Sequence, residues 1–112
     1  MRWIMIAGPY LSGVADAQQR AENLAALNRA ALAVFEKGHL PVIGVNMALP
    51  VIAEAGADRY AALMMPISLA LAERCDAILR IGGPSPGADA EMARMAAAGK
   101  PVYRRLEEIA PA

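Results

Sequence analysis

The sequence contains a single cysteine and a single histidine among its 112 residues. One cysteine cannot form a disulfide within the chain, which suits a reducing compartment, and we therefore expect a cytoplasmic protein. With His39 as the one histidine, the sequence excludes histidine-based triads and metal sites with several histidine ligands. No Gly-Lys-Ser/Thr follows a glycine-rich loop, so the phosphate loop of NTPases is absent too. We predict neither a metal site nor a cofactor.

The sequence also lacks a charge surplus and a long apolar run. Lys+Arg and Asp+Glu both number 11, whereas a general nucleic-acid binder needs a basic surplus to meet the phosphate backbone. The longest apolar run, from Tyr60 to Ala72, is broken by Pro66 and Ser68 and is shorter than the ~18 residues typical of a membrane span. The first residues do not follow a secretory signal pattern. We expect no nucleic-acid partner and no membrane partner.

What is present fits one folded domain over residues 1–112. The length is within the usual range for a single domain, and 57% hydrophobic residues are enough for a core without metal or disulfide support. Four short apolar segments predict strands, at residues 3–7, 40–45, 75–81 and 101–104. We place Pro41 at the first position of its strand, where no ladder donor is needed.

Capping residues mark two of the predicted helices. The first begins at Asp16, with Gln19 three residues later as in a capping box, and ends at Gly38. The other begins at Ser85-Pro86, with the serine as cap and the proline in the first turn, and ends near Gly99.

The middle of the chain leaves two interpretations open. Residues 46–57 are ambiguous, with a short helix over 48–55 interrupted by Pro50 as one possibility. Residues 58–74 are rich in helix formers, and Pro66 either kinks that helix or starts a new one.

Strands and helices alternate along the chain, which predicts an α/β fold with a parallel sheet covered on both faces. Right-handed crossovers then bring the carboxyl ends of all strands to one edge, where such sheets bind ligands. Two glycine-rich loops, Gly8 to Gly13 and Gly82 to Gly87, belong to that edge. We expect them to lie side by side.

The segment from Gly82 to Glu91 carries the strongest chemical signal. A helix N-terminus offers free N–H groups and a positive dipole end, Ser85 adds a hydroxyl, and Gly87 lets a ligand approach the backbone. Glu91 follows Gly87 by four residues and so shares its helix face. The alternative is an ordinary Ser-Pro helix start with a solvent-facing glutamate.

Other residues carry weaker signals. Gly8, Pro9 and Tyr10 end a strand at the same edge, and Asp58 could reach it from the second connection, although an exposed helix start explains Asp58 as well. We expect structural roles for a further group: Cys75 and the methionine pairs Met64-Met65 and Met92/Met95 in the core, Asp76 in a turn or cap, and His39 in a loop.

Four motifs occur in the same order as in a known superfamily. They are Ile-Ala-Gly-Pro-Tyr (Ile6 to Tyr10), Gly-His-Leu-Pro-Val (Gly38 to Val42), Cys-Asp-Ala-Ile-Leu (Cys75 to Leu79) and Ser-x-Gly-x-x-x-Glu (Ser85 to Glu91). In these motifs the chain resembles the nucleoside 2-deoxyribosyltransferase-like superfamily. It is most similar to a branch of small domains related to the 2′-deoxynucleoside 5′-monophosphate N-glycosidases.

This resemblance implies a flavodoxin-like, three-layer sandwich with a parallel sheet of four to five strands. It also implies cleavage of an N-glycosidic bond in a nucleoside or nucleotide, with Glu91 as the nucleophile. Ser85 stands where the monophosphate hydrolases have serine and the nucleoside transferases have aspartate, so it implies a ligand that bears phosphate. Gly8, Pro9, Tyr10, Gly87 and Asp58 then become candidates for shaping the substrate pocket. Relatives of this kind form homo-oligomers, so we expect a dimer or a higher oligomer.

At two positions the chain departs from the superfamily's pattern. Met5 stands where a tyrosine usually holds the nucleophile, and Ser68 where an aspartate helps to protonate the departing base. We assign that second role to Tyr10 or Asp58. Three alternatives stay open: a non-catalytic nucleotide-sensing module, a phosphoribohydrolase of the cytokinin-activating type, and an assembly protein that packs against a copy of itself, for which the apolar stretch around Met64, Met65 and Ile67 is a candidate surface.

Overall fold

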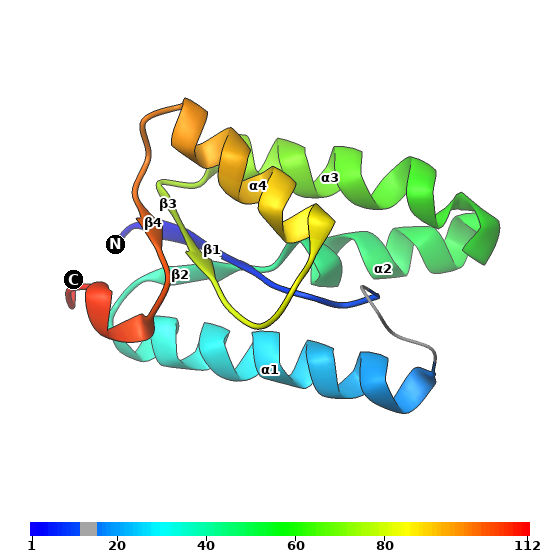
Figure 1. Cartoon of the computed structure of the whole chain (residues 1–112), viewed down its shortest axis with the longest axis horizontal. Helices are drawn as coiled ribbons and strands as arrows, with labels where there is room; N and C mark the ends of the chain where they lie inside the picture. Colours follow the sequence, from blue (N-terminus) through cyan, green and yellow to red (C-terminus); the bar gives the residue numbers. More distant parts are fainter. Residues whose placement is uncertain (12–15) are drawn as a thin grey trace.

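The protein is built on a four-stranded parallel sheet with the order β2-β1-β3-β4, as in flavodoxin-like folds (Figure 1). The computed structural model describes residues 1–11 and 16–112. Its strands are β1 (Trp3–Ala7), β2 (Leu40–Val42), β3 (Ala77–Arg80) and β4 (Val102–Tyr103). The predicted α/β class and the all-parallel sheet are therefore confirmed, with β1 and β3 paired at the centre.

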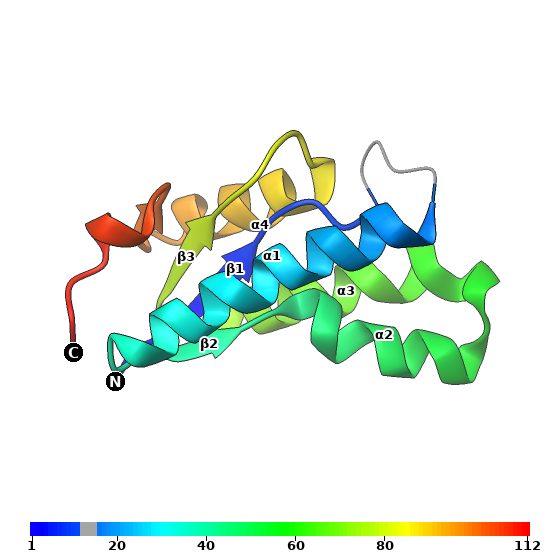
Figure 2. The same cartoon turned by 90° about the horizontal axis from the view of Figure 1, so that it is seen from below.

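Helices cover both faces of this sheet (Figures 1 and 2). On one face lies α1 (Ala17–Glu36), and on the other lie α3 (Tyr60–Arg74) and α4 (Pro86–Ala97). The remaining helical elements are α2 (Gly44–Ala55) and the 3₁₀ turns η1 (Ala57–Arg59) and η2 (Leu106–Glu108). In the described part of the chain no helix has both the length and the apolar character needed to cross a bilayer.

The central strands are apolar on both faces because each face is buried against helices. Ile4 and Ile6 of β1 pack with Leu27 and Val34 of α1, while Met5 of the same strand packs on the opposite face. That second cluster includes Ala72, Cys75, Ile78, Ala88 and Met95. Because successive side chains of a strand point to opposite faces, β1 contributes to a hydrophobic cluster on each face of the sheet.

The helix ends that the sequence predicts are confirmed. The Asp16 carboxylate accepts a hydrogen bond from the Gln19 backbone N–H at 2.7 Å, and the Ser85 hydroxyl accepts one from Ala88 N–H at 3.2 Å. Gly38 follows α1 with a positive φ of 93°, which an L side chain would strain. Each cap satisfies backbone groups that a helix terminus leaves without a partner.

The middle of the chain is helical, as predicted for residues 58–74 and as one possibility for residues 48–55, but its boundaries differ from the prediction. The strand expected over residues 40–45 ends at Val42, and α2 begins at Gly44 and continues through Pro50. Helix α3 likewise continues through Pro66. Proline inside a helix costs about 3 kcal/mol. Packing of α2 against α3, through a buried cluster of Ala48, Ile52 and Met64, offsets that cost.

The amino edge of the sheet is held by polar groups. The Asp76 carboxylate accepts from Trp3 N–H at 2.7 Å. His39 is buried, its Nδ1 accepts from Arg2 N–H at 3.2 Å, and its Nε2 lies 2.8 Å from the Ala110 carbonyl, to which it donates. The structural roles expected for Asp76 and Cys75 are confirmed, and His39 is, as expected, a loop residue between α1 and β2, where it also anchors the C-terminal segment.

At the carboxyl edge, the loops after β1 and β3 lie side by side. Ile81 N–H donates to the Ala7 carbonyl at 2.9 Å, one step beyond the β1–β3 ladder. A Cβ atom built on Gly8 would come within 2.9 Å of the Ile81 carbonyl oxygen, so the two loops touch through their backbones. Of the predicted Gly8 to Gly13 loop, residues 12–13 lie outside the described residues.

We predict that Leu27→Ala lowers the free energy of unfolding by about 2–5 kcal/mol, because it leaves a cavity between α1 and the sheet. Leu27 is 1% exposed, whereas Leu32 on the same helix is 59% exposed and is the matched control. Urea unfolding of both variants checks this. Equal losses for Leu27→Ala and Leu32→Ala would contradict the assignment of the core face.

Candidate functional site

A cavity of about 390 Å³ opens at the carboxyl edge of the sheet, where β1, β3, α3 and α4 meet. This size is within the range of small-molecule sites. Its lining residues come from four parts of the chain: Gly8, Tyr10 and Leu11 after β1; Val45 of α2; Tyr60, Ala61, Met64, Met65 and Ser68 of α3; and Ser85, Pro86, Gly87, Ala88 and Glu91 of the β3–α4 region.

The structure brings most of the candidate residues together here. Glu91 lines the same cavity as Gly8 and Tyr10, as do Ser85 and Gly87. Pro9 lies instead beside Gly82, where a Cβ built on the glycine would meet the proline ring at 2.8 Å. Asp58 is an exposed residue of η1 and is not part of the lining.

Helix α4 is what points Glu91 into the cavity. Because Ser85 caps the helix and Pro86 starts it, Gly87 and Glu91 fall four residues apart on one face. Glu91 is buried, with only 9% of its surface exposed, in contrast to the solvent-facing glutamate of the alternative interpretation. A Cβ on Gly87 would lie 3.3 Å from the Met65 sulfur, so a larger residue there would narrow the cavity.

The environment of Glu91 favours its neutral form. Burial raises the pKa of this carboxyl from 4.5 to about 7, against a smaller opposing effect of the Arg80 guanidinium. The ion pairs among the described residues join Arg80 to Asp89 and Arg94 to Glu73, so Glu91 belongs to neither. A carboxyl that changes charge near neutral pH inside a cavity is typical of a group used in acid, base or nucleophilic chemistry.

The N-terminus of α4 offers a small donor set to a ligand. Pro86 has no N–H, Ala88 N–H is bonded to the Ser85 hydroxyl, and Asp89 N–H is bonded to the Ser85 carbonyl at 2.9 Å. Among residues 1–11 and 16–112 the Gly87 N–H, in the first turn of α4, has no hydrogen-bond partner. The Ser85 hydroxyl accepts from Ala88, so its own hydrogen is available to a ligand oxygen. One N–H, one O–H and the helix dipole can therefore act on an anion here.

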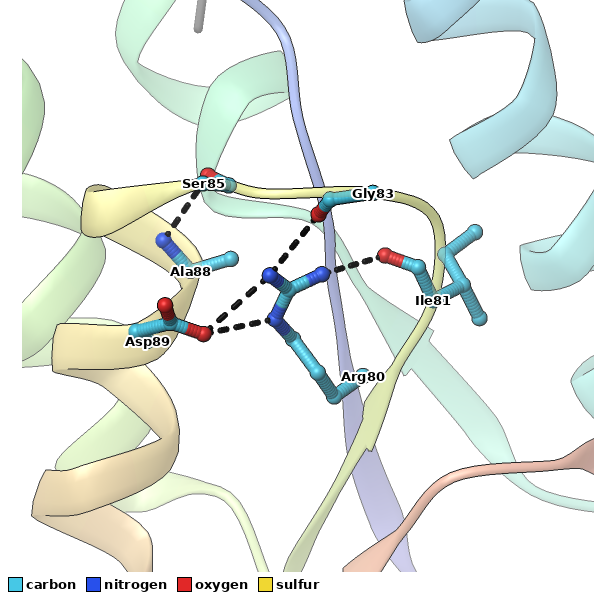
Figure 3. A network of polar contacts seen from close by, with 6 residues as sticks. All are labelled: Arg80, Ile81, Gly83, Ser85, Ala88 and Asp89. Carbon is cyan, nitrogen blue, oxygen red and sulfur yellow. Dashed lines mark hydrogen bonds and ion pairs between the residues drawn. The ribbon is translucent and has the colours of Figure 1, made fainter.

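Arg80, at the end of β3, is a residue that the sequence analysis missed (Figure 3). It is 8% exposed and donates to the Asp89 carboxylate, to the Ile81 carbonyl at 2.5 Å and to the Gly83 carbonyl at 2.9 Å. Its signal in the sequence is an arginine directly after Ile78-Leu79, where an apolar residue would fit the buried strand.

The α3 wall of the cavity was also incompletely predicted. Met64 belongs to the α2–α3 core cluster, as expected, but both it and Met65 line the cavity. Tyr60 lines it too, and burial, with a smaller contribution from Tyr10, raises the pKa of the Tyr60 phenol. Ile67 packs on the α2–α3 cluster. The stretch that was a candidate contact surface thus serves the core and the cavity.

Ser68 and Met5, the two positions that depart from the pattern of the superfamily that the chain resembles, lie in different surroundings. Ser68 lines the cavity, is 2% exposed and lies 3.7 Å from the Met64 sulfur, toward which its hydroxyl points. Met5 is fully buried in the middle of β1, within the cluster that contains Ala88, and is not part of the lining. Neither side chain carries an ionisable group.

Among residues 1–11 and 16–112 no set of three His, Cys, Asp or Glu side chains is placed to hold a metal ion. The cavity combines one buried carboxyl, phenol and serine hydroxyls, and an apolar methionine wall. This combination can hold a ligand that has an apolar part and a polar or anionic part. No protein-family model matches the chain, and no curated protein matches it.

We predict that the stability of the protein falls as the pH rises from about 4.5 to 7, because Glu91 binds its proton more tightly when folded than when unfolded. The full effect is of order 3 kcal/mol. Glu91→Gln mimics the neutral acid, so it should match the wild type at pH 4 and exceed its free energy of unfolding at pH 8.

Urea unfolding across this pH range measures the effect, with the exposed Glu54→Gln as the control. A Glu91→Gln variant with the same pH dependence as the wild type would show that the carboxyl is not held in a desolvated place.

Proposed function

We propose that this protein binds a nucleoside 5′-monophosphate at the carboxyl edge of its sheet and cleaves the N-glycosidic bond. The observation that carries the proposal is that the buried Glu91 carboxyl, the Gly8–Tyr10 turn and the Ser85–Gly87 helix start line one cavity. The resemblance to nucleoside 2-deoxyribosyltransferase-like proteins supports the same function from the motif order. Homo-oligomerisation and a cytoplasmic location stay predictions.

In the proposed reaction the ionised Glu91 attacks the anomeric carbon of the sugar. A carboxylate oxygen forms an ester bond to that carbon, and the C–N bond breaks with its electron pair leaving on the base. The base takes up one proton. Water then hydrolyses the ester, which returns the carboxylate and releases the sugar phosphate; a second base in place of water gives transfer instead.

Tyr10 is the proposed source of the proton for the leaving base. Tyr10 lines the cavity together with Glu91, whereas Asp58, the other candidate, lies outside the lining. Ser68, at the position where relatives have an aspartate, is a weak acid. Loss of a general acid typically slows such reactions by ~10²–10⁴, so we expect slow turnover.

The helix start favours a ligand that bears phosphate. Ser85 is neutral and can donate a hydrogen bond to phosphate, whereas a carboxylate in its place would repel it. The Gly87 N–H and the dipole of α4 add to the attraction.

The second candidate function is a nucleotide sensor without catalysis, which the neutral Ser68 inside the cavity favours. Calorimetry and product analysis on the same protein separate the two: tight binding without base release supports the sensor. The cytokinin-activating phosphoribohydrolase stays a weaker alternative, because the chain lacks the threonine and the spacing of that family's signature. The self-assembling protein is weaker too, because Met64, Met65 and Ile67 contribute to the core and the cavity.

We predict that Glu91→Gln abolishes base release from a panel of ribo- and deoxyribonucleoside monophosphates while the protein stays folded, because the amide cannot form the ester. Chromatography of the free base measures this, with Glu54→Gln as the control. Activity of the wild type should rise through about pH 7, where Glu91 ionises. Base release by Glu91→Gln at the wild-type rate would remove Glu91 from the mechanism.

We predict that Ser85→Asp keeps the helix cap but exchanges the ligand preference, because aspartate caps a helix as well as serine does and repels phosphate. Affinity for a monophosphate should fall about tenfold or more relative to the matching nucleoside. Calorimetry with both ligands checks it, and Ser85→Thr, which keeps a hydroxyl cap, is the control. An unchanged ratio of the two affinities would mean that phosphate does not bind at this helix start.

A further inference from the structure

We propose that Arg80 is a positioning residue for this cavity: its buried guanidinium fixes the β3–α4 loop so that Ser85 and Gly87 face an anionic group of the ligand. The ligand-binding part of this inference rests on the proposed function. The positioning part rests on geometry alone.

Arg80 joins both ends and the middle of the loop (Figure 3). Its Nε and one terminal nitrogen lie 3.1 Å from the same carboxylate oxygen of Asp89, in the first turn of α4. The terminal nitrogens also donate to the carbonyls of Ile81 and Gly83 at 2.5 and 2.9 Å. A planar fork with fixed donor directions can hold all of these acceptors at once, which a lysine ammonium cannot do.

Stability alone is a weak explanation for this arginine. Its side chain is 7% exposed while that of Asp89 is 56% exposed, so the pair places a desolvated cation against a carboxylate that water still reaches. Removing a charged group from water costs several kcal/mol, and an apolar residue at such a position is often as stabilising as the ion pair. The bonds to Ile81 and Gly83, in contrast, specify one conformation of a loop that contains two consecutive glycines.

The Arg80 guanidinium also acts electrostatically on the Glu91 carboxyl. The groups that face Glu91 or act on it come from several elements: Arg80 of β3, Tyr10 after β1, Tyr60 of α3, and Cys75 after α3. Of these four, Arg80 is the one that carries a formal charge. It opposes the effect of burial on Glu91 and so favours the ionised carboxylate that nucleophilic attack needs. The Asp89 carboxylate, which pairs with Arg80, carries the opposite charge and weakens this field.

The test uses four variants of the full chain. Arg80→Met removes the charge and the donors, Arg80→Lys keeps the charge but not the fork, and Asp89→Asn removes the counter-charge while keeping an acceptor. Arg94→Met is the matched control, since Arg94 is a half-exposed arginine of α4 that pairs with Glu73. The readouts are the titration of the Glu91 carboxyl by carbon NMR, hydrogen exchange of the Gly87 amide, and calorimetry with a 2′-deoxynucleoside 5′-monophosphate and its nucleoside.

We expect the Glu91 titration midpoint to rise by about 1 pH unit in Arg80→Met and to fall in Asp89→Asn, while Arg80→Lys and Arg94→Met leave it unchanged. Gly87 exchange should accelerate in both Arg80 variants. Affinity for the monophosphate should drop about tenfold in both, while affinity for the nucleoside stays within about threefold of the wild type.

Shifts of the Glu91 midpoint in the same direction in Arg80→Met and Asp89→Asn, or equal losses of affinity for nucleotide and nucleoside, would overturn the inference in favour of general loosening. If the wild type binds no nucleotide, the proposed function fails, and the titration and exchange results still decide the positioning role. Wild-type titration and wild-type exchange in Arg80→Met would then overturn it.

Discussion

The candidate site depends on the pairing of β1 with β3 at the centre of the sheet. The two strands are still hydrogen bonded one residue beyond the ladder, where Ile81 N–H meets the Ala7 carbonyl. From that point the chain turns toward α1 on one face and toward α4 on the other (Figure 2). Strands that part in this way leave a gap at the carboxyl edge, and ligands of open α/β sheets bind there. Gly8 lets the two loops approach until their backbones touch, so the Tyr10 turn and Glu91 reach one cavity.

Two ionisable side chains, Glu91 and Arg80, are buried next to this gap, and burial removes each of them from water. Glu91 gains nothing from an ion pair in the described part of the chain, and its proton stays bound up to about pH 7. Arg80 satisfies its donors with two loop carbonyls and one half-exposed carboxylate. A carboxylic acid and a guanidinium placed within electrostatic reach of one another, but not in an ion pair, leave the acid able to ionise near neutral pH. Burial of unpaired or partly paired charge in a cavity is the pattern expected of a functional site rather than of a core.

Local chemistry made part of this arrangement predictable. Asp16, Ser85 and Gly38 mark helix ends through hydrogen bonds and a backbone angle that involve only neighbouring residues, and the spacing from Gly87 to Glu91 follows from the helix period. The course of α2 and α3 was predictable only in part, because Pro50 and Pro66 are helix breakers by local rules and only contacts between the two helices outweigh them. The role of Arg80 was not predictable either. Its acceptors depend on how the β3–α4 loop folds back, and a helix or strand period in the sequence does not reveal that conformation.

The donor set at the start of α4 also limits what can bind there under the proposed function. Pro86 removes one N–H and the Ser85 cap occupies two more, so the first turn presents the Gly87 N–H and the Ser85 hydroxyl. P-loop sites cradle several phosphates with consecutive backbone N–H groups and a lysine. Under that proposal two donors and a helix dipole suit a single phosphate ester, while Arg80, which lies outside the cavity lining, holds the loop that carries these donors. Because the first turn offers only two donors, displacing either one would remove half of the hydrogen bonds that orient the proposed ligand against Glu91. The proposed function therefore requires that the loop keep one conformation.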